Sequence, residues 1–98
     1  MQYNFEWDRA KAADNRRKHA VSFEQASELF ADPLALTLFD HAHSSAIEVR
    51  WITLGCTRAG QHLVVVHSFE EQGNTATVRI ISARPATRHE RNAYEQRQ

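Results

Sequence analysis

The sequence predicts one α+β domain, in which two N-terminal helices and one C-terminal helix pack on an antiparallel sheet in the order β-α-α-β-β-β-β-α. Three observations predict this class. Helix-start signatures follow a short N-terminal strand, β-rich segments with short turns occupy the middle of the chain, and another helix-start signature lies near its end. A chain of 98 residues can bury one hydrophobic core, so we expect a single domain over residues 1–98.

The first expected elements are a strand and a helix. Aromatic and polar residues alternate over Tyr3–Trp7, which predicts a strand. Asp8 occupies an N-cap position before a run of helix formers, so a helix should cover Arg9–His19. The basic cluster Arg16–Lys18 at its end complements the helix dipole and equally suits contact with RNA, and the residues alone leave both interpretations open.

A second helix is expected directly after the first. Ser22 and Gln25 match a capping box, and the apolar residues that follow form one stripe at helical spacing. This helix should continue to about Ala31, because Asp32-Pro33 interrupts it.

The sheet is expected from four further β-rich segments, joined by the polar loop Asp40–Ser45 and by turns at Gly60 and Gly73. The segments are Leu34–Phe39, Glu48–Leu54, His62–Phe69 and Ala76–Ala83. Short turns between consecutive strands predict an antiparallel meander. A second capping box, Thr87 with Glu90, then predicts a final helix that packs back on the sheet.

The register of the sheet stays open at this stage. Pairing Leu54 with Leu63 would place Arg50 opposite His67, whereas a shift of one residue would send His67 to the other face. In the shifted register we expect His67 to share a face with Arg79, which is the better arrangement for catalysis.

Composition excludes several classes of protein. No apolar segment approaches the roughly 20 residues of a membrane span, and no signal peptide is recognisable, so we expect a cytoplasmic protein that does not contact a membrane. The net charge is zero, which argues against non-specific coating of nucleic acid. Residues 1–49 carry five Lys/Arg against eight Asp/Glu, and residues 50–98 carry seven against four. Any binding of phosphate should therefore be local.

Several kinds of catalytic site find little support. Asp40, His41 and His43 have the side chains of a zinc site but lack a further ligand, and the single Cys56 has no partner cysteine. No nucleophile elbow and no phosphate-binding glycine loop are present. We expect no metal and no cofactor. The remaining possibility is acid–base chemistry at an RNA phosphodiester, with the 2′-hydroxyl as nucleophile.

Such a site needs proton-transferring groups and fixed cations. Arg79 and Arg84 bracket the apolar strand segment before the last helix, and a guanidinium fits a pair of phosphate oxygens. The candidates for proton transfer are His67, His19, Glu90 and Tyr94, and Arg50 is a further cation. Solvated or ion-paired arginines and structural histidines are the competing interpretations. The late cations also include Arg88, Arg91 and Arg97.

A set of short motifs, taken in order over nearly the whole chain, closely resembles the BrnT toxin family. The motifs are Phe5-Glu6-Trp7-Asp8, Lys11, Asn15, Lys18-His19, Val21-Ser22-Phe23-Glu24, Asp32-Pro33-Leu34-Ala35, His43-Ser44, Glu48-x-Arg50, Leu54-Gly55, Arg79-Ile80-Ile81-Ser82-Ala83-Arg84, Glu90 and Tyr94. The resemblance implies a RelE-like fold and a ribonuclease toxin of a bacterial type II toxin–antitoxin system that inhibits translation and growth.

The resemblance also implies partners, and the candidates given above then make up the expected site. The expected antitoxin is a BrnA-like protein with a ribbon-helix-helix region, through which the complex would reach promoter DNA. The expected catalytic residues are His67, Arg79, Arg84, Glu90 and Tyr94, and the expected RNA contacts are Lys11, Lys18, His19 and Arg50. The alternative is a noncatalytic antitoxin-binding subunit or a decayed toxin.

Two positions depart from the family pattern. Ala20 stands where the family often has glycine, so a left-handed helix cap would be less comfortable here. Glu70 stands near a position where family members often have arginine, and its carboxylate would repel RNA.

Overall fold

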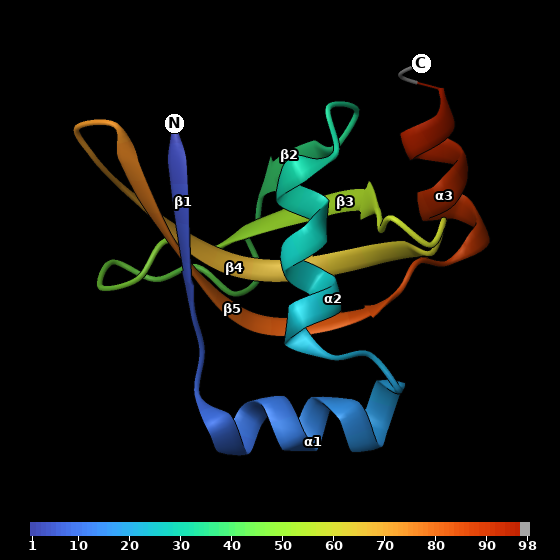
Figure 1. Cartoon of the computed structure of the whole chain (residues 1–98), viewed down its shortest axis with the longest axis horizontal. Helices are drawn as coiled ribbons and strands as arrows, with labels where there is room; N and C mark the ends of the chain where they lie inside the picture. Colours follow the sequence, from blue (N-terminus) through green and yellow to red (C-terminus); the bar gives the residue numbers. More distant parts are fainter. Residues whose placement is uncertain (97–98) are drawn as a thin grey trace.

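The computed structural model describes residues 1–96 as three α-helices, one 3-10 helix and one five-stranded sheet (Figure 1). In chain order the elements are β1 (Gln2–Glu6), α1 (Arg9–His19), α2 (Phe23–Ser27), the 3-10 helix η1 (Glu28–Ala31), β2 (Leu36–Phe39), β3 (Trp51–Cys56), β4 (His62–Gln72), β5 (Thr75–Pro85) and α3 (Arg88–Glu95). The predicted α+β class and element order are confirmed. Arg97 lies outside the described residues.

The sheet is mixed, with strand order β1-β5-β4-β3-β2. Strands β2 to β5 form the predicted antiparallel meander. The prediction of a purely antiparallel sheet is wrong at one edge, because β1 pairs with β5 in parallel and places Phe5 opposite Val78. The first and last strands are joined by no hairpin, so neither turn residues nor periodicity could indicate how they pair.

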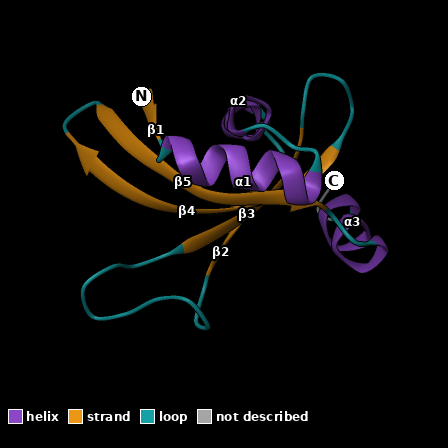
Figure 2. Ribbon diagram, turned by 90° about the horizontal axis from the view of Figure 1, so that it is seen from below, coloured by secondary structure: helices purple, strands orange, loops and turns teal. Residues whose placement is uncertain are grey.

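The hydrophobic core lies between α2, η1 and one face of the sheet. Figure 1 shows α2 crossing in front of the strands and α1 running beyond β5 at the edge of the sheet, and Figure 2 shows α3 beside the strand ends. The buried core residues are Val21, Phe23, Ala26, Leu29, Leu63, Val65, Val78, Ile80 and Ala83. The side chains at alternate positions of β4 and β5 therefore point toward α2 and η1, and the intervening ones point away from them.

Local hydrogen bonds explain where two elements differ from expectation. β3 begins at Trp51 rather than Glu48, because the Ser45 hydroxyl accepts from the N–H of Glu48 and the Ser44 hydroxyl accepts from that of Arg50. β2 begins at Leu36 rather than Leu34, since an Asp32 carboxylate oxygen accepts from the N–H of Leu34. In both places a side-chain oxygen accepts the backbone hydrogen bond that a neighbouring strand would otherwise accept.

Helix α1 has the predicted bounds, and it ends in a left-handed cap although alanine stands there in place of glycine. The Asp8 carboxylate accepts from the backbone N–H of Lys11, and Ala20 has φ 57° and ψ 29°. A Cβ atom makes this backbone region unfavourable, so alanine is strained where glycine would not be.

Replacing Ala20 with glycine should raise the free energy of unfolding by about 1 kcal/mol, because the left-handed strain disappears. Urea titrations followed by circular dichroism would measure the change. Ala13→Gly, at an exposed position inside α1, is the matched control and should lower stability by about 1 kcal/mol. Equal losses in both variants would contradict the strained cap.

Candidate functional site

The predicted meeting of His67 with Arg79 does not occur. β3 and β4 adopt the shifted register, with Leu54 opposite Val64. A β-bulge between β4 and β5 then places His67 opposite Ile80 and Arg79 opposite Ser68. Neighbouring residues of a strand point to opposite faces, so the expectation that His67 and Arg79 share a face is wrong.

His67 is buried on the face that packs against η1. The residue is 1% exposed, and its ring packs edge-on against Phe30, with the ring centres 4.9 Å apart. Nε2 lies 2.7 Å from Thr53 Oγ1, and Nδ1 lies 3.1 Å from the carbonyl oxygen of Ser68. Burial lowers the pKa of His67 below its usual value, so the imidazole is stabilised in its neutral form.

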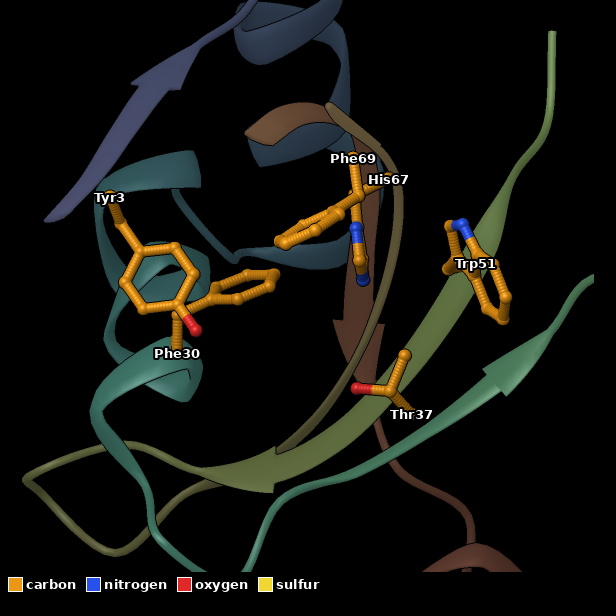
Figure 3. A pocket seen from close by; sticks show the side chains of 6 residues that line it. All are labelled: Tyr3, Phe30, Thr37, Trp51, His67 and Phe69. Carbon is orange, nitrogen blue, oxygen red and sulfur yellow. The ribbon is translucent and has the colours of Figure 1, made fainter. Parts of the chain in front are cut away.

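Aromatic side chains surround an open pocket above His67. It has a volume of about 300 Å³ and is lined by Tyr3, Phe30, Thr37, Trp51, His67 and Phe69 (Figure 3). The polar groups among these side chains are the Tyr3 and Thr37 hydroxyls, the Trp51 indole N–H and the imidazole. None of the lining residues carries a formal charge when His67 is neutral.

The two arginines of β5 point away from the core. Arg79 stands between the buried Val78 and Ile80, is 44% exposed, and has a guanidinium nitrogen 3.7 Å from a carboxylate oxygen of Glu6. Arg84 instead forms two parallel hydrogen bonds of 2.8 Å to the carboxylate of Glu90. Arg79 is therefore the more available of the two for an external anion.

Glu90 is engaged in two local roles. Its carboxylate accepts from Arg84 and from the backbone N–H of Thr87, which completes the predicted capping box of α3. The hydrogen bond from Arg84 is the main reason why the pKa of Glu90 falls to about 2. A carboxylate with this pKa stays ionised near neutral pH and is a weak base.

Replacing Glu90 with glutamine should lower the free energy of unfolding at pH 7 by roughly 1–2 kcal/mol. The effect is no larger because solvent screens the partly exposed guanidinium of Arg84. The pKa of Glu90 is depressed in the folded state, so its contribution is present above the unfolded value of 4.5 and is lost as the pH falls toward 2. Urea titrations at several pH values would measure this. The variant and the parent should converge in acid, and a constant difference at every pH would contradict the prediction.

Tyr94 is fixed at the other side of α3. Its hydroxyl donates to Asp32 Oδ2 over 2.7 Å, and the same oxygen accepts from the N–H of Cys56 over 2.9 Å. Burial, together with this hydrogen bond, raises the pKa of Tyr94 to about 12. The hydroxyl thus connects α3 to the end of η1. The five expected catalytic residues occupy several separate places rather than one.

The structure does bring together three of the four expected RNA contacts. Lys11, Lys18 and His19 line one hollow of about 160 Å³ between α1 and β5, together with Asp14, Asn15, Ile81 and Ser82. Arg50 lies elsewhere, with Nε 2.8 Å from a carboxylate oxygen of Glu48. Cations, an imidazole and a hydroxyl therefore converge beside the strand segment that carries Arg79 and Arg84, together with the carboxylate of Asp14.

Asn15 holds the two walls of this hollow together. Its amide oxygen accepts from the backbone N–H of Ala83, and its amide nitrogen donates to the carbonyl oxygens of Ala83 and Val21. The side chain is 6% exposed and occupies the position of a missing strand partner for β5. Sequence reasoning assigned no role to Asn15, although a polar residue within a helix-forming segment could have indicated one.

The remaining polar side chains considered from the sequence make only local contacts. His43 Nδ1 lies 2.9 Å from Asp40 Oδ2, and His41 packs edge-on against Phe39. Within residues 1–96 no three His, Cys, Asp or Glu side chains gather in a way that could hold a metal ion. Glu70 is exposed on β4, opposite Thr77.

Comparison with known proteins assigns the family. The model of the family described as "Ribonuclease toxin, BrnT, of type II toxin-antitoxin system" matches residues 7–90. The chain belongs to the BrnT family. Membership of this family implies an antitoxin partner. The matched residues include α1, the whole sheet except β1, and the first turn of α3.

One solved structure resembles this BrnT-family chain over most of its length. The crystal structure of the Brucella abortus ribonuclease toxin BrnT superposes with a TM-score of 0.61 and 20% sequence identity, covering 90% of this chain and 100% of that one. This likeness concerns the fold. A comparison with curated protein sequences finds no match. No helix within residues 1–96 is long and apolar enough to cross a membrane.

Proposed function

We propose that this BrnT-family protein is an endoribonuclease toxin that cleaves RNA without a metal ion, in the bacterial cytoplasm, and thereby inhibits translation and growth. The observation that carries the proposal is the match of the ribonuclease toxin family model to residues 7–90. The convergence of cations, an imidazole and a hydroxyl in the hollow between α1 and β5 supports it chemically.

The hollow between α1 and β5 has the groups that RNA cleavage needs. Lys11 and Lys18 would stabilise the charge that develops on the phosphate, and His19 would take the proton of the 2′-hydroxyl or donate one to the leaving oxygen. Arg79, on the same strand as Ser82, would hold a neighbouring phosphate, and so would Arg84 once RNA competes with Glu90 for it. Lys18 already lies 3.0 Å from Asp14, which leaves Lys11 as the less engaged cation.

The alternative groups for proton transfer are His67, Glu90 and Tyr94. Arg50 would be a distant RNA contact. Each of the three is held by hydrogen bonds that RNA would have to replace. We therefore favour His19 for proton transfer and assign these three positioning roles in the fold.

RNA cleavage in the presence of a chelator tests the proposal. The purified chain should cut a labelled single-stranded RNA in EDTA and release products that end in a 2′,3′-cyclic phosphate. The same oligonucleotide with 2′-deoxyribose at the cut position should survive, because the internal nucleophile is missing. An RNA that stays intact under all conditions would refute the enzyme, and cleavage of the deoxy substrate would refute the 2′-hydroxyl mechanism.

The expected partner is a BrnA-like antitoxin with a ribbon-helix-helix region, and promoter DNA would be reached only through that protein. A noncatalytic antitoxin-binding subunit is the second candidate, favoured by the neutralisation of Arg84 by Glu90. Expression of the chain alone in bacteria separates the two. Growth arrest with loss of RNA integrity supports the toxin, whereas harmless expression of folded protein supports the noncatalytic subunit.

A further inference from the structure

The aromatic pocket above His67 is built from elements far apart in the sequence. Tyr3 comes from β1, Phe30 from η1, Trp51 from β3 and Phe69 from β4. Figure 3 shows Tyr3 and Phe30 on one side of the opening and Trp51 on the other, with His67 between them. None of the residues that line it lines the hollow between α1 and β5, so the two sites are separate.

Ring contacts hold the walls of this pocket in place. Tyr3 and Phe30 have ring centres 5.9 Å apart, and Phe30 in turn packs edge-on against the buried His67. On the opposite side Trp51 is supported by Phe39, with ring centres 5.5 Å apart. Aromatic faces supported in this way present a flat apolar surface at little cost in conformational entropy.

A directed chain of hydrogen bonds orients the Thr37 hydroxyl, one of the polar groups of the pocket. The carbonyl of Ser68 can only accept, so Nδ1 of His67 carries the proton and Nε2 accepts from the Thr53 hydroxyl. Thr53 Oγ1, which lies 2.8 Å from Thr37 Oγ1, then accepts from the Thr37 hydroxyl. The remaining lone pairs of the exposed Thr37 oxygen are available to a donor in the pocket.

The charges around the pocket favour an uncharged occupant. No lining side chain is cationic, and burial keeps the imidazole neutral. A phosphate would find no counter-charge there, whereas the flat, uncharged ring of a nucleobase matches the aromatic walls and carries N–H groups at its edge. An aliphatic side chain of a protein partner would leave the Thr37 oxygen without a donor.

We propose that this pocket binds one unpaired nucleobase of the RNA, which stacks on the aromatic walls while a base N–H donates to the Thr37 oxygen. The inference rests on the proposed ribonuclease function and assigns it a second contact with RNA, away from the scissile phosphate. Because the site is separate from the α1–β5 hollow, the pocket contributes to affinity and to the choice of sequence rather than to the chemical step.

Binding of a non-cleavable RNA tests the pocket directly. The probe is a mixed-sequence 2′-O-methyl heptanucleotide, compared with its abasic counterpart, which keeps the sugars and phosphates. In NMR spectra of the full chain, the Trp51 indole N–H and the Thr37 amide should shift with the first probe only, and Trp7→Phe assigns the Trp51 signal. Equal shifts with both probes would overturn the proposal. Trp51 and Thr37 signals that do not move with the heptanucleotide would overturn it too, whether or not the heptanucleotide binds elsewhere on the chain.

Two variants separate affinity from chemistry. Phe69→Ala, at a residue 39% exposed, should weaken binding of the heptanucleotide and raise KM about tenfold, because base stacking is lost. Thr37→Val keeps the shape of the side chain and should change which base is preferred. For both variants kcat should stay within about twofold of the parent. Leu34→Ala, an exposed apolar residue outside the pocket, is the control and should change neither constant.

The outcomes also separate this proposal from the ribonuclease itself. Efficient RNA cleavage with no shift at Trp51 would refute the pocket and leave the enzyme intact. A base-dependent shift without any cleavage would refute the enzyme and leave the base-binding site. If Phe69→Ala or Thr37→Val lowers the melting temperature, the NMR comparison with the unaltered chain still decides the matter.

Discussion

Replacing Asn15 with leucine should lower the free energy of unfolding by about 3 kcal/mol or more. The change leaves the buried N–H of Ala83 without an acceptor and the carbonyls of Ala83 and Val21 without this donor. Each unsatisfied buried backbone group costs about 1–3 kcal/mol, and leucine restores none of the bonds. Urea titration followed by circular dichroism would measure the loss.

The exposed Asn92 of α3 provides the matched control. Asn92→Leu makes the same chemical change on a helix surface and should alter stability by less than about 0.5 kcal/mol. Amide hydrogen exchange adds a local measurement, since the N–H of Ala83 should lose its protection in Asn15→Leu before the rest of β5. Equal stability of the two leucine variants would show that Asn15 does not hold α1 on the sheet.

The second large effect is expected on catalysis. His19→Ala should reduce kcat for RNA cleavage by about 10²–10⁴-fold, because the proposed proton-transfer group is removed. His19 is exposed at the end of α1, so the melting temperature should hardly change. Initial rates on a labelled single-stranded RNA at saturating concentration would measure the loss.

Another exposed histidine serves as the control for this variant. His89→Ala, on α3, should cleave at the parental rate. Lys11→Ala should lower kcat by a smaller factor, because it removes a cation that stabilises the charge on the phosphate. It should also make RNA binding less sensitive to salt, since one contact with a phosphate is lost. If His19→Ala retains full activity while His67→Gln loses it without unfolding, the proton-transfer role belongs to the buried histidine instead.

Local signals predicted those elements that local interactions stabilise. The Asp8 cap and the following helix formers predicted the bounds of α1, and the Thr87–Glu90 capping box predicted α3. Strand ends were predicted less well, because serine and aspartate side chains at Ser44 and Asp32 form hydrogen bonds that replace a strand partner. Such bonds depend on where the chain returns in space, which periodicity does not reveal.

The candidate site was predicted only in part. Lys11, Lys18 and His19 were grouped as RNA contacts, and they line one hollow. Their common wall exists because α1 lies along β5, an arrangement held by Asn15 across 68 residues of sequence. Whether the grouped residues bind RNA stays a prediction that the variants above test.

The α+β class, the order of the elements, the helix caps and the resemblance to the BrnT family can be read from the sequence, because they depend on neighbouring residues and on motif order. Three further features depend on how distant segments pack. β1 pairs with β5 in parallel, a β-bulge separates His67 from Arg79, and Arg84 points toward Glu90. A one-residue change in strand register reverses which face a side chain occupies, and that choice is made by packing between distant segments.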